Sequence, residues 1–417
     1  MRPPRSLRVL SLVAAGAAAL SACGSGGAAP TAARPANSAP VSGWAATLAQ
    51  ARGQTVNWYM YGGDETLNSF VNGYVSQQLR AVGVTLNQVK ITDTVDAVNT
   101  VLAQKQAGKD TGGAVDAIWL NGENFATGVQ ADLWHCGWAP SLPNARFLDS
   151  SNPANTSDFG TPVNGCEAPW QQANSALVYD STALSPPDVA SLSSLGAWAK
   201  VHPGRFTYPA PPDFTGSLVV RTFLYGRLRG PGPLAGSFDE AAYVKATGPL
   251  WSQLRSLKPA LWRHGSTYPP TQDAVEKLFA DGEISAYFTY GPGAVADKVA
   301  KGVFPASTRE AVLAEGNIAN TSFLAIPQDS PHQAAALVLA NVLEDPQTQL
   351  ALFKAEGTYP AIDLSKTTAK VQGAFAAVPQ SASVLALSTL LQHTLPELQA
   401  AYVTRLEKDW KTQVLQR

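Results

Sequence analysis

Carboxylates and aromatic rings stand near the ends of several apolar runs, and together they suit the binding of a cation. Carboxylates supply the counter-charge, and each aromatic face adds cation–π attraction of about 0.5 to 2 kcal/mol. These residue types therefore favour an organic cation with an apolar or aromatic body. The set comprises Asp64, Glu65, Glu123, Glu167, Trp170 and Tyr290.

Most of these side chains also have a possible structural role. Asp64 stands just before a helical periodicity and can cap that helix, and Glu65 is a charge that a first turn favours. Glu123 is a poor cap, which favours a binding role. Trp170 can pack at a hinge, and Tyr290 can pack in a core. A phosphate or sulfate ligand stays open, because glycine-rich turns at helix starts suit anions.

Glycines and polar residues in the neighbouring turns complete the candidate site. In an open α/β sheet, ligands bind beyond the carboxyl ends of the strands, and glycine lets backbone N–H groups approach them closely. Trp58 and Trp119 lie within predicted strands, so we expect them to be buried. The further ligand-binding candidates are Gly62, Gly63, Asn121, Asn124, Phe214, Thr215, Asn320 and Thr321.

An N-terminal segment carries basic residues, a short apolar run over 9–20, and the motif LSAC ending at Cys23. The run is too short to span a bilayer permanently. The motif resembles the bacterial lipobox, whose cysteine receives a diacylglyceryl group. This resemblance implies a signal peptide over 1–22 and lipidation of Cys23; a secretory signal with a chance cysteine is the alternative. Residues 23–46, rich in Gly, Ala, Pro and Ser, predict a flexible tether.

The two other cysteines, Cys136 and Cys166, predict a disulfide, because exported proteins usually pair their cysteines. Closing a loop of about 30 residues stabilises a fold by about 3 to 4 kcal/mol. A metal site using His135 beside Cys136 is the alternative. It lacks the further closely spaced ligands that zinc requires.

Composition excludes some classes of function and leaves others open. The chain has 417 residues, a net charge of -1 and 15% charged residues, without a Lys/Arg block, which argues against a nucleic-acid partner. Its length predicts two lobes. The sequence has neither a G-x-S-x-G nor an H-E-x-x-H motif, so we predict no catalytic residue, resident metal or cofactor. A secreted lipoprotein hydrolase, whose triad assembles only in space, and a solute-independent scaffold lipoprotein remain alternatives.

Apolar periodicity predicts the elements that must position these residues. Strands over 55–61, 84–91 and 115–120 alternate with helices, the pattern of an open parallel sheet. Residues 141–165 predict a loop, and the last 40 residues predict helices. Further strands are expected at 175–179, 205–208, 284–290 and 322–326, and further helices at 192–201, 217–225, 241–257, 271–281, 331–344 and 346–356.

Four segments, in this order, resemble the extracellular solute-binding proteins of ABC importers: VDAIWLNGENF, APWQQANSALVYDS, GEISAYFTYGPG and NTSFLAIPQDSPHQAAALVLANVLED. The segment HPGRFTYPAPPDFTGS resembles a subfamily near the groups that bind thiamine, polyamines or iron. The resemblance implies the two-lobed type II periplasmic-binding fold. Each α/β lobe would hold an open, mainly parallel sheet flanked by helices, with the ligand cleft between the lobes.

The resemblance also implies a division of the chain and a role. The first lobe would span 47–172 and the second 173–321. The chain would return to the first lobe over 322–360, and 361–417 would pack across both. A monomeric, lipid-anchored receptor on the outer face of a bacterial membrane would deliver a thiamine-like or polyamine-like solute to a permease and its ATPase. Ferric iron is disfavoured, because the iron-binding groups use adjacent tyrosines and the sequence has none.

Overall fold

The computed structural model describes residues 43–386, 389–390 and 392–417. Residues 1–42, which include the predicted signal peptide, Cys23 and most of the predicted tether, lie outside the described residues. Residues 44–46, which we assigned to the tether, instead begin helix α1 (Trp44–Ala51), because the Trp44 ring packs against a hydrophobic core. Within the described ranges, no helix has the length and apolar character needed to cross a membrane.

The first lobe is built on a six-stranded sheet. Its strand β1 (Thr55–Tyr61) runs parallel to β2 (Thr85–Ile91) on one side and to β3 (Ala117–Leu120) on the other. Strand β10 (Asn317–Ala325) is antiparallel to β3 and β6 (Glu167–Asn174), and it runs parallel to β11 (Thr394–Leu395). The three strands predicted before residue 121 are confirmed.

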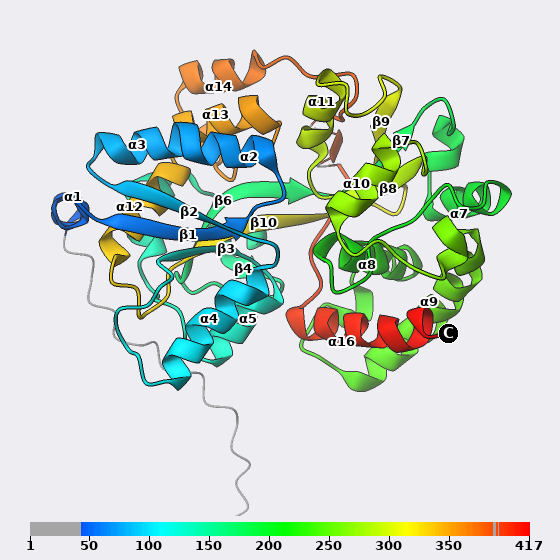
Figure 1. Ribbon diagram of the computed structural model, residues 1–417, viewed down its shortest axis with the longest axis horizontal. Coiled ribbons are helices and arrows are strands. Elements are labelled where there is room, and N and C mark those ends of the chain that lie inside the picture. Colours follow the sequence, from blue (N-terminus) through cyan, green and yellow to red (C-terminus); the bar gives the residue numbers. More distant parts are fainter. Residues whose placement is uncertain (1–42, 387–388, 391) are drawn as a thin grey trace, which may run out of the picture. The chain divides into compact units, whose positions relative to one another are not determined.

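Helices cover both faces of this sheet (Figure 1). The side chains of β3 alternate between them: Ala117 and Trp119 join the core under α12, whereas Ile118 and Leu120 join the core under α4 and α5. A strand buried on both faces reads as one apolar run, as predicted for this segment. The helices are α2 (Glu65–Phe70), α3 (Ser76–Ala81), α12 (Gln333–Leu343) and α13 (Pro346–Glu356) on one side, and α4 (Thr94–Gln106) and α5 (Glu123–Gln130) on the other.

The second lobe contains a three-stranded sheet with β7 (Ala176–Asp180) between β8 (Ala286–Thr289) and β9 (Thr308–Ala311). Strand β7 is antiparallel to both neighbours, so the expected mainly parallel sheet is correct for the first lobe and wrong for this one. Strands this short, and largely buried, carry no periodicity that reports their direction. The helices around this sheet are α7 (Leu192–Val201), α8 (Phe214–Leu228), α9 (Glu240–Leu257), α10 (Gln272–Ala280) and α11 (Pro292–Ala300).

Three further predictions need correction. The expected strand 205–208 is only an isolated bridge between Phe206 and Ala286, because its neighbouring residues form no ladder. In the last 40 residues, α16 (Ala400–Trp410) and the π-helix Lys411–Leu415 after it are helical, whereas the described residues before them are mostly irregular. The predicted loop 141–165 contains three short elements: α6 (Pro153–Thr156), β4 (Ser157–Asp158) and β5 (Thr161–Pro162). Elsewhere in the chain, helix α14 (Ala369–Ala376) follows α13.

Candidate functional site

The carboxyl ends of β1, β2 and β3 lie along one edge of the first-lobe sheet, which faces the second lobe (Figure 1). A turn and the N-terminus of α2, α4 or α5 follow each strand. Tyr61, the last residue of β1, donates a hydrogen bond from its hydroxyl to Oδ1 of Asp273 in α10 at 2.9 Å. The ends of these strands therefore lie at the boundary between the lobes.

We call four carboxylates at this place the boundary carboxylates: Asp93, Glu123, Asp213 and Glu407. The pKa of Glu407 in α16 is raised to about 7 by burial and then by the charge of Glu123, with Asp93 adding to it. Burial, together with the charge of Asp93, raises the pKa of Asp213 to about 6. Burial also raises the pKa of Glu123, and Asp93 contributes there too. The charge of Asp93 thus reaches Glu123 in the first lobe as well as Asp213 and Glu407. The Asp213 carboxylate also caps α8, accepting from the Thr215, Gly216 and Gln272 N–H groups.

Two more carboxyl groups lie deeper in the first lobe, behind Glu123. Asp158 is 1% exposed, and its Oδ2 accepts a hydrogen bond from the Gly122 N–H at 2.8 Å. Glu167 is 2% exposed, and its carboxyl oxygens have no hydrogen-bond partner in the described part of the chain. Burial raises the pKa of both groups well above the ordinary range. Both are thus held towards their neutral form.

Arg221 of α8 brings a buried cation to the same region, but its charge is already matched. Its Nε lies 3.0 Å from Oε2 of Glu397, and both side chains are almost fully buried. Arg221 also donates to the Tyr290 hydroxyl at 2.9 Å, and Tyr290 donates in turn to Glu397. An anionic ligand would have to compete with Glu397 for this guanidinium.

Residues 74–377 match the family described as "Bacterial extracellular solute-binding protein". The chain belongs to this family. Protein YnjB of Escherichia coli strain K12 is 36% identical over 309 residues, which cover 74% of this chain and 79% of YnjB. The family supplies receptors to ABC importers, and it places the chain outside the cytoplasm.

Solved structures of such receptors share the fold. The spermidine/putrescine ABC transporter substrate-binding protein of Streptococcus pneumoniae aligns with a TM-score of 0.59 at 12% identity, covering 86% of this chain and 99% of that one. The periplasmic binding protein AfuA of Actinobacillus pleuropneumoniae, bound to fructose-6-phosphate, aligns with a TM-score of 0.60 at 11% identity over 87% and 98%. At these identities the likeness concerns the fold alone, which confirms the two-lobed α/β architecture expected from the sequence.

The candidates after β1 lie at the boundary, where several have structural roles. A Cβ on Gly63 would meet Oδ2 of Asp273 at 2.8 Å, and one on Gly62 would meet the Lys90 side chain at 2.7 Å. Asp64 caps α2 by accepting from two backbone N–H groups. Glu65 is exposed and forms an ion pair with Lys90 at 3.3 Å. The glycines therefore permit a close approach, whereas Asp64 and Glu65 have the helix-start roles that the sequence had left open.

The aromatic candidates divide between the core and the boundary. Trp170 is 1% exposed and packs edge-on against Trp58 and Trp119, so it has the packing role. Trp119 is only half-buried, which corrects the expectation that it would be buried like Trp58. Phe214 begins α8 and is half-buried, and its ring centroid lies 4.9 Å from that of Tyr290, with the rings tilted by 34°.

The polar candidates flank the same region. Strand β3 ends at Leu120, opposite Phe323, so residues 319–322 of β10 extend past it towards the second lobe. Nδ2 of Asn320 and Oγ1 of Thr321 are buried without a hydrogen-bond partner among the residues described. Thr215 is buried in the first turn of α8, and Asn121 and Asn124 are half-buried beside Glu123.

Sequence reasoning missed five charged residues: Asp93, Asp213, Arg221, Glu397 and Glu407. Asp93 could have been found, because it stands in the turn after the predicted strand 84–91, and the rule used for the other strand ends applies to it. Asp213 directly precedes the candidate Phe214. Glu397 and Glu407 carried no such signal, because only the packing of the C-terminal segment against α8 brings them to the boundary.

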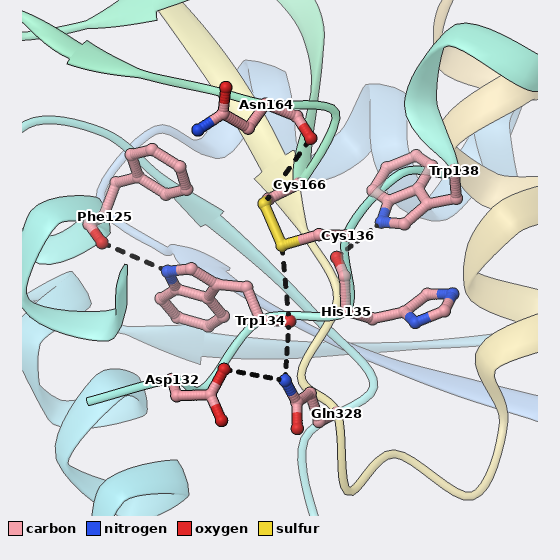
Figure 2. Close-up of a disulfide and its surroundings, with 9 residues drawn as sticks. All are labelled: Phe125, Asp132, Trp134, His135, Cys136, Trp138, Asn164, Cys166 and Gln328. Atoms are coloured by element: carbon pink, nitrogen blue, oxygen red, sulfur yellow. Dashed lines mark hydrogen bonds between the residues drawn. A yellow bond between two sulfur atoms is a disulfide. The ribbon is translucent and has the colours of Figure 1, made fainter. Parts of the chain in front are cut away.

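The predicted disulfide between Cys136 and Cys166 is confirmed, and it closes the segment that carries Asp158 (Figure 2). The His135 ring points away from the sulfur atoms, and burial lowers its pKa, so the imidazole is neutral at neutral pH. In the described ranges, no three His, Cys, Asp or Glu side chains are grouped to hold a metal ion. Cys166 directly precedes Glu167, so the bridge fixes the start of β6.

Proposed function

We propose that the chain captures a small organic cation between its lobes and delivers it to the permease and ATPase of an ABC importer. The four boundary carboxylates carry this proposal. They come from both lobes, so a cation placed among them would attract both lobes at once. Burial makes their mutual repulsion costly until a positive charge arrives.

Nearby residues add support for a cation with an apolar body. The half-buried rings of Trp119 and Phe214 offer flat surfaces near the boundary. Asn320 and Thr321 offer polar atoms without partners among the described residues. The similar protein from Streptococcus pneumoniae is named as a spermidine/putrescine substrate-binding protein, whereas AfuA binds fructose-6-phosphate. The pairing of Arg221 with Glu397 favours the cation.

The test is a calorimetric titration and thermal-shift screen of the purified protein. Putrescine, spermidine and thiamine form the cationic arm, and fructose 6-phosphate, sulfate and glucose form the other. We expect at least one cation to raise the unfolding midpoint and to bind with a measurable heat. Tight binding of an anion or a neutral sugar, without binding of any cation, would overturn the proposal.

A matched pair of variants locates the binding. Glu123→Gln, at the start of α5, should weaken the best cation by about tenfold, as the loss of one charged contact of about 1.5 kcal/mol implies. Asp132→Asn, just past the other end of α5, removes an exposed carboxylate that pairs with Lys105. We expect this control to bind as the wild type does.

A further inference from the structure

A second group of contacts joins the lobes on the α2 side of the first-lobe sheet. The Thr66 hydroxyl, in α2, donates to Oδ2 of Asp297 in α11 at 2.8 Å and accepts from Lys301 at 3.2 Å. Lys301 pairs with Asp297 at 2.7 Å. Helix α2 packs into a core of the first lobe, and α11 packs into the core around β7 and β8. The Thr66 hydroxyl thus bridges two separately packed bodies.

Two glycines touch at the same place. Gly293 lies in the first turn of α11, and Gly357 caps the C-terminus of α13 in the left-handed conformation, with φ of 67°. A Cβ on Gly293 would lie 2.2 Å from the carbonyl oxygen of Glu356 and 2.4 Å from the carbonyl carbon of Gly357. Both atoms belong to the backbone, so the two helices would have to move apart to accept it.

A buried carboxyl group lies beside this contact. Glu356 is 6% exposed, and burial, with the charges of Asp64 and Asp297, raises its pKa to about 9. Glu356 is therefore neutral at pH 7, which avoids a third negative charge beside Asp64 and Asp297. The site thus tolerates close approach of the lobes at neutral pH.

We propose that Thr66, Asp297, Lys301, Gly293 and Gly357 form a latch that holds the lobes together and sets how long a captured solute stays bound. The part of this proposal that concerns solute rests on the proposed function, whereas the part that concerns the lobes does not. The latch lies on the opposite face of the sheet from α4 and α5, which begin beside Asp93 and at Glu123. Its residues would therefore act on the bound state by positioning the lobes.

The first experiment needs no solute. Nitroxide labels on Asp96→Cys and Lys200→Cys, both exposed and one in each lobe, report the distance between the lobes in the protein carrying Cys23→Ser. Gly293→Ala should lengthen or broaden this distance distribution. Its melting temperature should not fall, because alanine favours a helix more than glycine does.

Gly291→Ala is the matched control. It stands at the start of the same helix, and its added Cβ would meet nothing closer than 3.9 Å. We expect the wild-type distance distribution for this variant. If Gly293→Ala keeps the wild-type distribution as well, the latch is wrong.

The second experiment measures dissociation of spermidine by stopped-flow fluorescence. Thr66→Val removes the hydroxyl and keeps the shape, so the dissociation rate should rise about fivefold, the effect of losing one hydrogen bond, with an unchanged association rate. Thr66→Ser keeps the hydroxyl and should restore the slow rate. An unchanged dissociation rate in Thr66→Val would contradict the role of the latch in retention. If the wild type binds no spermidine, the proposed ligand is wrong, and the label distances alone decide on the latch.

Discussion

At the boundary carboxylates, the cation proposed above would compete with a proton for the same oxygen atoms. The raised pKa of Asp213, about 6, and that of Glu407, about 7, mean that both groups are largely protonated at pH 5 and charged at pH 8. A bound cation favours the charged forms. Binding should therefore release protons between these limits, and acid should weaken it.

This reasoning predicts the direction of the pH dependence. The affinity for putrescine, whose two primary amines stay protonated throughout, should fall as the pH is lowered from 8 to 5. Calorimetry in two buffers of different ionisation enthalpy would measure the protons released near pH 6.5. An affinity that is flat over this range, or that rises in acid, would contradict the assignment.

The variant Glu407→Gln distinguishes the titration of Glu407 from that of Asp213. It should remove the upper part of the pH dependence, near pH 7, and leave the lower part that belongs to Asp213. Loss of the whole dependence would show that the two groups do not titrate separately.

At the scale of elements, the ion pair of Arg221 and Glu397 ties α8 to the C-terminal segment. Both side chains are almost fully buried, and the Tyr290 hydroxyl bridges them. Removing one partner of a buried pair leaves an unmatched charge, which costs about 3 to 5 kcal/mol. The pair therefore fixes the C-terminal segment, and with it Glu407, against the second lobe.

We expect Glu397→Gln to lower the free energy of unfolding in urea by about 3 kcal/mol. The matched control is Asp281→Asn, which breaks the exposed pair with Lys277 and should leave the free energy of unfolding nearly unchanged. The double variant Arg221→Met with Glu397→Gln should regain part of the loss. Equal effects of the buried and the exposed variants would contradict this view of the segment.

Much of the first lobe could be predicted from the sequence, because its strands and helices have a clear apolar period. The strands 55–61 and 84–91 and the helices that follow them are confirmed. The antiparallel direction of β8 and β9 could not be predicted. It depends on their pairing with β7, which is distant in the sequence. The strand predicted over 205–208 is also wrong. Its apolar residues are buried in the core, but they form no ladder with another strand.

Only some of the residues at the boundary between the lobes could be identified from the sequence. The rule that ligands lie beyond strand ends placed Glu123 correctly at the boundary. It also selected Glu65, which is exposed, whereas the predicted crossover segment led to Trp170, which lies in the core. Arg221 and Glu397 are 176 residues apart, and no local pattern encodes such a pair.

At the scale of the whole molecule, the receptor must stay near its importer. We propose that a lipid on Cys23, which lies outside the described residues, provides the anchor. Cys23→Ser should move the protein from the membrane fraction to the soluble fraction and leave its affinity for spermidine unchanged. Fractionation of cells followed by calorimetry checks both parts. Retention in the membrane, or a changed affinity, would contradict this separation of anchor and receptor.

The bridge between Cys136 and Cys166 has a further consequence, for damage rather than for folding. A receptor outside the cytoplasm meets proteases, and segment 137–165 carries exposed residues such as Ser150 and Ser151. A single cut there would leave the two halves joined through sulfur. Asp158 could then keep its bond to the Gly122 N–H, because both sides of the cut remain held by the fold. The nicked chain would migrate as one species without reductant and as two with it.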